Sequence, residues 1–206
     1  MNILLFCKKT VNYFVKHLMI NKLSNVNKIV YLTFDDGPET GITEFVIDQL
    51  ELYGFTATFF CKGENAEKYP SLLQRILVSG NSIANHTYSH MHAFNYNCNQ
   101  YVNDVEKARL FLDTNIFRPP HGSLTFKTWL KLRKKYRIFY WSINSGDSDL
   151  GNYDLERSMK NLTKTKSGDV ILFHFCNKHA NETRELLPKY LQWLALHGYT
   201  SKAIKF

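Results

Sequence analysis

The chain has 206 residues, which is the length of one domain with a substantial apolar core. Hydrophobic residues make up 44% of the chain and charged residues 21%, a composition that excludes an intrinsically disordered protein. The formal net charge is +8, but the densest basic patch, at 127–137, lacks aromatic residues at the spacing of a base-stacking surface. We therefore expect no nucleic-acid partner. The four cysteines are widely spaced and predict buried thiols rather than a disulfide framework.

The N-terminal segment, 1–27, differs in character from the remainder of the chain. Its short apolar run is followed at once by Lys8 and Lys9, so the positive charge stands on the wrong side for a secretory signal peptide, and we expect a cytoplasmic protein. Residues 8–22 predict a basic amphipathic helix. We expect this segment to pack against a single domain that spans 28–206. Peripheral contact of the helix with an anionic membrane is the alternative.

Strand-like and helix-like patterns alternate along the rest of the chain. Strands are expected at 28–34, 55–60, 81–84, 116–117, 136–142, 170–175 and 199–204. Helices are expected at 41–53, 64–79, 99–113, 125–134, 152–164 and 179–197. Such alternation predicts an α/β fold with a parallel sheet covered by helices, and about seven strands favour closure into a barrel over an open sheet.

Two adjacent carboxylates, Asp35 and Asp36, close the first expected strand. Because they repel each other and resist desolvation, we expect a cation beside them. His86 and His90 follow the third expected strand, and their spacing lets both imidazoles face one ion. One carboxylate and two imidazoles are a common part of a catalytic metal site with open positions for water and substrate. The second carboxylate is then free to act as a base.

Further side chains that can bind a ligand or take part in catalysis follow other expected strand ends. They are Arg118, Trp141 and His174. In a barrel of parallel strands, functional groups gather at the carboxyl ends of the strands. We therefore expect these three residues to share one site with the carboxylates and the imidazoles.

Four short motifs, in this order, resemble those of the polysaccharide deacetylases of the NodB-homology type, carbohydrate esterase family four. They read TFDDGP at 33–38, HTYSH at 86–90, RPPHG at 118–122 and LFH at 172–174. The resemblance covers nearly the whole chain from residue 28 onward. It implies a distorted (β/α)7 barrel and the metal-dependent removal of acetyl groups from N-acetylated sugars in an oligosaccharide, glycolipid or cell-wall glycan.

The residues and the resemblance together indicate a role for each metal-site side chain. Asp36, His86 and His90 are the expected ligands of a divalent cation, most readily zinc, with cobalt or nickel as alternatives. Such a cation polarises an amide carbonyl and acidifies water to a pKa of about 7. Asp35 is expected to be the general base, and Arg118 is expected to orient it through an ion pair.

The remaining site residues are expected to handle the leaving group and the substrate. His174 is the expected general acid, because an imidazole with an ordinary pKa of about 6.5 donates a proton near neutrality. The alternative is a core histidine at the end of an apolar strand. The backbone N–H of His121 is an expected oxyanion donor, and Trp141 and Leu172 form an expected apolar floor for the acetyl methyl. We also assign Asp147 to the substrate-binding residues.

One motif departs from the family pattern. The family's W-x-x-D-x-x-D-W reads WSINSGDS here, so that Asn144 stands where an Asp is common and Ser148 where a Trp is common. An amide raises the pKa of a neighbouring imidazole far less than a carboxylate does. If Asn144 is the partner of His174, the acid is less readily charged, unless Asp147 or Asp149 takes its place. The missing Trp removes a stacking wall for sugars.

Three hypotheses on function follow from these observations. The first is a metal-dependent deacetylase that acts on N-acetylated glycans. The second is a catalytically weak carbohydrate-binding protein on the same fold, which the altered motif motivates. The third is hydrolysis of a different acyl group or ester on the same metal centre.

Overall fold

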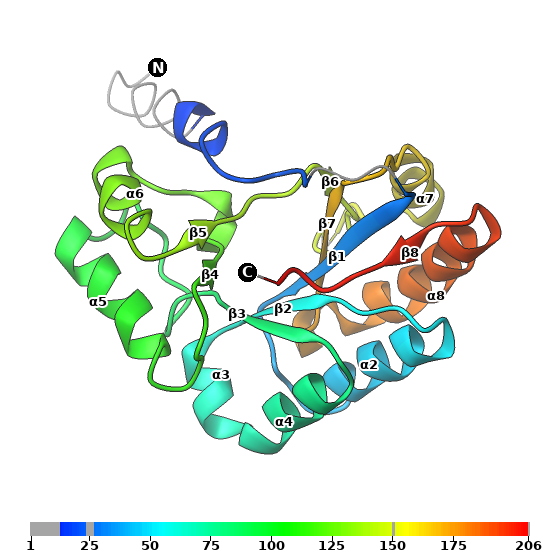
Figure 1. The fold of residues 1–206 in the computed structure, drawn as a ribbon, viewed down its shortest axis with the longest axis horizontal. Coiled ribbons are helices and arrows are strands. Elements are labelled where there is room, and N and C mark those ends of the chain that lie inside the picture. The colour runs from blue at the N-terminus through cyan, green and yellow to red at the C-terminus, as the bar shows by residue number, and fades with distance from the viewer. Residues whose placement is uncertain (1–12, 24–26, 150, 206) are drawn as a thin grey trace.

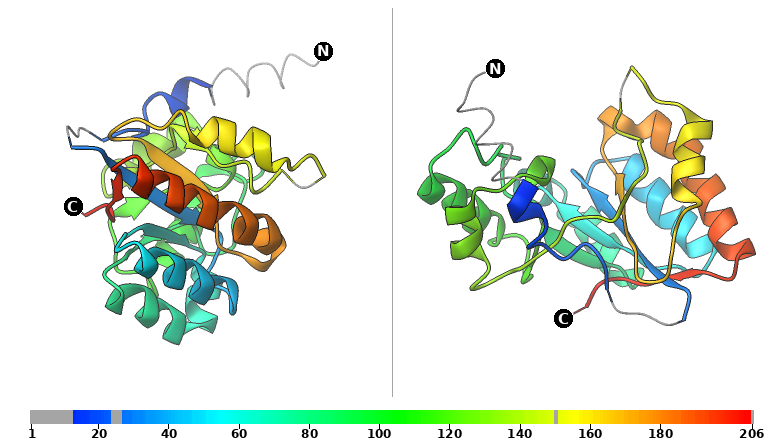
Figure 2. Two further views of the ribbon diagram at one scale, coloured as in Figure 1. Left: turned by 90° about the vertical axis from the view of Figure 1, so that its right-hand side faces the viewer. Right: turned by 90° about the horizontal axis from the view of Figure 1, so that it is seen from above.

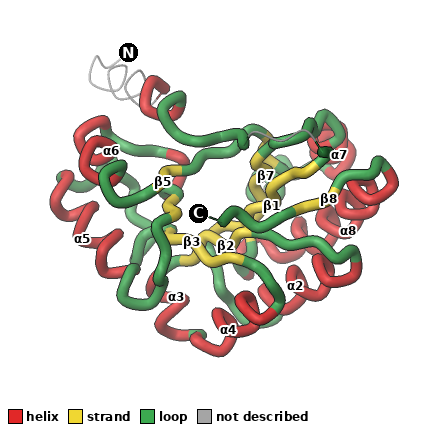
Figure 3. Tube along the Cα trace, viewed as in Figure 1, coloured by secondary structure: helices red, strands yellow, loops and turns green. Residues whose placement is uncertain are grey.

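A strongly curled sheet of parallel strands, covered by helices on its outer side, forms the body of the molecule in a computed structural model (Figures 1 and 3). The structure describes residues 13–23, 27–149 and 151–205. The strands are β1 (Ile29–Asp35), β2 (Thr58–Cys61), β3 (Ser82–Asn85), β4 (Ile116–Phe117), β5 (Arg137–Ile138), β6 (Ile143–Asn144), β7 (Val170–His174) and β8 (Thr200–Ser201). The helices are α2 (Ile42–Leu52), α3 (Gly63–Lys68), α4 (Pro70–Val78), α5 (Cys98–Ala108), α6 (Phe126–Leu132), α7 (Leu155–Leu162) and α8 (Ala180–Leu196).

The sheet runs in the order β5-β4-β3-β2-β1-β7-β6, and β8 pairs with the start of β1. Every strand pairing is parallel. The central strand β1 is an apolar run, and its last four side chains are all buried. This arrangement confirms the expected NodB-type fold, as a sheet curled into a barrel that stays open between β5 and β6. The N-terminal segment spans this opening, where Ile20 bridges to Phe139 and Lys22 to Asp169.

Two expected elements differ from the observed ones for clear physical reasons. The expected helix at 64–79 is two helices, because the ring of Pro70 disfavours a helical conformation at Tyr69 and starts α4 instead. The expected strand at 136–142 is only the short β5. Beyond it the chain changes neighbours: the N–H of Phe139 donates to β4, whereas that of Ser142 donates to Val170 of β7. The sequence pattern did not predict β6, which follows this crossing.

Two large apolar clusters flank the sheet. The first packs β1, β2 and β7 against α2 and α8. The second lies under α5 and α6 and includes Val15 and Met19 from the N-terminal segment. Figure 2 shows the N-terminal helix, in blue, beside α5 and α6 and away from α2 and α8. Within the described residues, the segment therefore packs on the domain, with these two side chains buried and Ile20 and Leu23 partly buried against a third cluster.

The N-terminal segment exposes two large aromatic side chains. Tyr13 and Phe14 are exposed on it. The first part of the expected helix at 8–22 lies outside the described residues. Among the helices that the structure describes, none combines the length and the apolar character needed to span a bilayer.

The packing of α8 gives a direct test of the core. Leu191 is fully buried in the first cluster, whereas Leu196 on the same helix is 76% exposed. We expect Leu191→Ala to lower the free energy of unfolding by about 2–5 kcal/mol, because it removes buried methyl groups and leaves a cavity. Leu196→Ala should change the free energy of unfolding by less than about 0.5 kcal/mol. Urea denaturation of both variants checks this; equal effects would contradict the described packing.

Candidate active site

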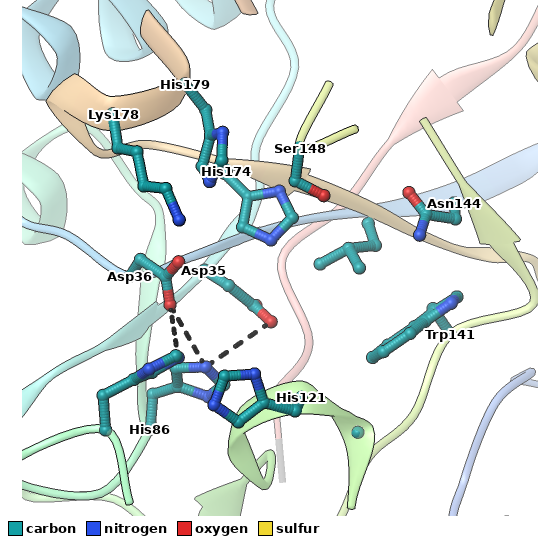
Figure 4. Close-up of a pocket in the computed structure, with 13 residues that line it drawn as sticks. Asp35, Asp36, His86, His121, Trp141, Asn144, Ser148, His174, Lys178 and His179 are labelled. Atoms are coloured by element: carbon teal, nitrogen blue, oxygen red, sulfur yellow. Dashed lines mark ion pairs between the residues drawn. The ribbon is translucent and has the colours of Figure 1, made fainter. Parts of the chain in front are cut away.

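A cavity of about 350 Å³ opens at the carboxyl-terminal edge of the sheet (Figure 4). Its walls contain the three expected metal ligands, Asp36, His86 and His90, together with Asp35 and His174. These side chains come from the ends of β1, β3 and β7, which the strand order places close together. The structure thus brings together these residues, which were expected to share a site because each follows the end of a strand.

The carboxylate of Asp36 faces two imidazoles. Its Oδ1 lies 2.9 Å from Nε2 of His90 and 3.4 Å from Nε2 of His86. Nδ1 of His86 lies 2.8 Å from the carbonyl oxygen of Arg118, which can only accept a hydrogen bond. Nδ1 is therefore the nitrogen that donates to the backbone, and Nε2 is the nitrogen that faces Asp36 and the cavity.

Oδ1 of Asp36 is buried and makes no hydrogen bond of good geometry with the described residues. Burial disfavours the charge on Asp36, but His86 and His90 outweigh it and hold the pKa of the carboxyl far below its usual range. An ionised oxygen without a hydrogen bond, next to two imidazole nitrogens, is the donor set that a divalent cation requires. These three residues therefore fit a metal ion.

The backbone around this group is held in unusual conformations. Asp36 has a φ of 83° and His90 a φ of 58°, values that side chains other than glycine adopt rarely. The N–H of Asp36 donates to Phe60, and its carbonyl oxygen accepts from the side chain of Asn65 at 3.0 Å. The surrounding hydrogen bonds thus enforce a conformation that aims the carboxylate into the cavity.

Arg118 holds Asp35 in place, as expected. The guanidinium is fully buried, and its Nη1 lies 2.7 Å from Oδ1 of Asp35. It also donates to the hydroxyl of Thr33 and the carbonyl oxygen of Tyr140, and it lies 4.1 Å from the ring centre of Phe60. Oδ2 of Asp35 has no such partner among the residues that the structure describes, and it lies 3.8 Å from Nε2 of His86. One oxygen is therefore fixed, and the other is left to face the cavity.

His174 is paired with Asp147. Its Nδ1 lies 2.8 Å from Oδ1 of Asp147, and its backbone N–H donates to Oδ2 of the same carboxylate at 2.7 Å. Ser145 and Thr183 also donate to Asp147. Burial opposes the charge on His174, but the carboxylate of Asp147 outweighs it and raises the pKa of the imidazole to about 9. His174 is thus a protonated imidazole at neutral pH.

Two interpretations from the altered motif are corrected by this geometry. Asp147 is fully buried behind His174, so it does not bind substrate directly but positions the imidazole. Asn144 is not the partner of His174, because its side-chain oxygen accepts from the N–H of Gly146. Asp147, which stands at the second Asp of the family pattern and was the expected alternative, supplies the carboxylate.

Three of the expected substrate-binding residues also line the cavity. His121, Trp141 and Leu172 line the cavity. His121 has a φ of 59°, and the N–H groups of Gly122 and the next residue donate within this turn, whereas no hydrogen bond of the His121 N–H is found among the described residues. Burial, together with His90, lowers the pKa of the His121 side chain to about 4, so the ring is neutral. The backbone N–H of His121, which has no acceptor among the described residues, remains available as a donor.

Sequence reasoning did not assign three residues of the cavity wall. Lys178 and His179 follow the end of β7 and line the cavity. Gly122 lines it as well, and a Cβ there would lie 2.7 Å from the ring of Trp141. The signal that identified the other residues, their position after a strand end, also applies to Lys178 and His179.

Comparisons with known proteins agree with this geometry. A sequence model of the family described as polysaccharide deacetylase matches residues 22–138. A peptidoglycan-N-acetylglucosamine deacetylase of Bacillus cereus is 31% identical over 86% of this chain and 87% of its own. The chain spans less than half of the length of several longer relatives. The chain therefore belongs to the polysaccharide deacetylase family.

Solved structures show the same likeness. The Bc1960 peptidoglycan N-acetylglucosamine deacetylase, in complex with an N-hydroxybenzamide derivative, superposes with a TM-score of 0.83 at 28% identity and covers 94% of both chains. A family 4 carbohydrate esterase from Streptomyces lividans, in complex with acetate, has a TM-score of 0.78 at 28% identity over 88% of this chain and 95% of its own. The fold and the motifs therefore point to one enzyme class.

The pairing of His174 with Asp147 predicts a measurable titration. In the metal-free protein, NMR should show the His174 imidazole losing its proton near pH 9. Asp147→Asn should move this pKa down toward the ordinary value of about 6.5, because the amide no longer favours the charged ring. Asp149→Asn, which changes an exposed neighbour, should leave the titration unchanged. A pKa that is equal in wild type and Asp147→Asn would contradict the pairing.

Proposed function

We propose that this protein removes acetyl groups from N-acetylglucosamine units of peptidoglycan or a similar glycan, with a divalent cation held by Asp36, His86 and His90. The observation that carries the proposal is the buried Oδ1 of Asp36, which lacks a hydrogen bond and faces two imidazole nitrogens. The peptidoglycan deacetylases among the relatives and solved structures support the substrate class.

The first chemical step depends on Asp35. A cation bound by the three ligands would polarise the amide carbonyl and make an attacking water more acidic. Oδ2 of Asp35 is the group within reach that accepts the proton of this water, because Oδ1 is engaged by Arg118. The ion pair with Arg118 fixes the direction of the carboxylate.

The second step depends on His174. The leaving sugar amine must gain a proton before the C–N bond breaks. His174 carries that proton at neutral pH because Asp147 stabilises the imidazolium, and it lines the same cavity as Asp35. Base and acid therefore belong to two separate pairs, Asp35 with Arg118 and His174 with Asp147.

The other residues that line the cavity position the acetyl group. The N–H of His121 is placed to donate to the oxygen on which negative charge develops. Trp141 and Leu172 offer an apolar surface to the methyl group. Ser148 lines the cavity where the family commonly has a Trp, so the sugar rings meet a more open wall.

Replacing the base tests the mechanism. We expect Asp35→Asn to release acetate from N-acetylglucosamine oligomers about a hundredfold to ten-thousandfold more slowly than wild type, because proton abstraction is lost. The three proposed ligands remain, so the bound cation should also remain. Acetate release and metal content measured on the same sample check both statements, with Asp48→Asn, an exposed site, as the control.

The same experiment distinguishes a loss of catalytic activity from a loss of folding stability. Asp35→Asn weakens the partner of a buried guanidinium, so the unfolding midpoint is measured alongside the rate. Unchanged acetate release by a folded Asp35→Asn variant would show that another group is the base. A cation-loaded wild-type protein that releases no acetate from any N-acetylated glycan would refute the proposed function.

A further inference from the structure

A second set of metal-binding side chains meets Asp36 from the other side of the cavity. Ligand atoms of Asp36, Cys176 and His179 all lie within 4.8 Å of one another, which is the same closeness that Asp36, His86 and His90 show. We propose that Asp36, Cys176 and His179 form a second site for a transition-metal cation, which shares Asp36 with the first site.

His179 supplies an observation that points to a ligand. Its side chain is 5% exposed, it lines the cavity, and Nδ1 has no hydrogen-bond partner among the described residues. Figure 4 shows the ring extending from the segment after β7 toward His174 and the cavity. A buried nitrogen without a partner is costly unless a ligand completes it. A cation held with Asp36 and Cys176 is a ligand that can do so.

Cys176 has the properties of a ligand rather than of a disulfide partner. Its thiol is free and only 5% exposed. The N–H of His179 donates to the Cys176 carbonyl oxygen, so a tight turn presents both side chains from one short segment. When a cation binds, the thiol proton leaves to solvent and the sulfur becomes a thiolate ligand. Sulfur, imidazole and carboxylate together favour zinc or cobalt over magnesium or calcium.

Asp36 has an oxygen for each site. Oδ1 faces the imidazoles of His86 and His90, whereas Figure 4 shows the other oxygen turned toward the side of His174 and His179. A carboxylate that bridges two cations commonly holds them about 3.5–4 Å apart. The long side chain of Lys178, which extends toward Asp36 in Figure 4, is exposed and free to turn outward when a cation binds.

Occupation of this site has a consequence for the reaction, which rests on the proposed function. The ring centres of His179 and His174 are 5.1 Å apart, so a cation bound by His179 lies beside the proposed acid. Its positive charge disfavours the protonated form of that imidazole. The second cation is therefore inhibitory: the rate rises as the first equivalent binds and falls as the second binds.

A titration of the full chain with Co²⁺ tests the site directly. Wild type should bind two equivalents and show the near-ultraviolet charge-transfer absorption of a cobalt–thiolate bond. Cys176→Ser should bind one equivalent without this absorption and keep the rate at high Co²⁺. Cys98→Ser, which changes a free cysteine on α5, should behave as wild type. His90→Ala should weaken the first site but keep the absorption, which separates this proposal from the deacetylase activity.

Three results would overturn the inference. The first is a wild-type protein that binds one equivalent and shows no cobalt–thiolate absorption, a result that does not depend on the folding of any variant. The second is absorption that persists in Cys176→Ser and disappears in Cys98→Ser. A rate that does not fall with the second equivalent in wild type would overturn the inhibitory role.

Discussion

The buried ion pair between Arg118 and Asp35 organises the carboxyl-terminal edge of the sheet. A guanidinium that is fully removed from water requires a charged partner, and the loss of that partner typically costs about 3–5 kcal/mol. The pair links the residue after β4 to the end of β1, across the intervening strands β2 and β3. Because Arg118 also fixes His86 through its carbonyl oxygen, one residue sets the position of the base and of a proposed metal ligand.

The site separates its charges by giving each ionisable group its own partner. Asp35 has Arg118, Asp36 has two imidazoles, and His174 has Asp147. Adjacent carboxylates would otherwise raise each other's pKa, and a buried imidazole would otherwise lose its proton. The hypothesis of a catalytically weak binding protein was motivated partly by Asn144, and it loses that support because Asp147 provides the carboxylate.

Local sequence signals predicted much of this arrangement, and long-range geometry supplied the remainder. The strand-end positions of Asp35, His86 and His174 follow from apolar runs that stop at polar residues, and parallel pairing then places them at one edge. The sequence left the partner of His174 open between Asn144, Asp147 and Asp149, because hydrogen bonds in the folded chain decide which side chain points inward. Strand β6 was missed because its pairing depends on where the chain crosses the open side of the barrel. Neither the partner of His174 nor the pairing of β6 is determined by residues that are close in the sequence.

The most direct test of the account is anomalous X-ray diffraction at the zinc absorption edge from crystals of the protein soaked with one equivalent of Zn²⁺. The account predicts a single dominant peak within coordination distance of Asp36, His86 and His90, with Asp35 still paired to Arg118. Well-ordered side chains that point away from one another, with no anomalous peak among these three ligands, would contradict it.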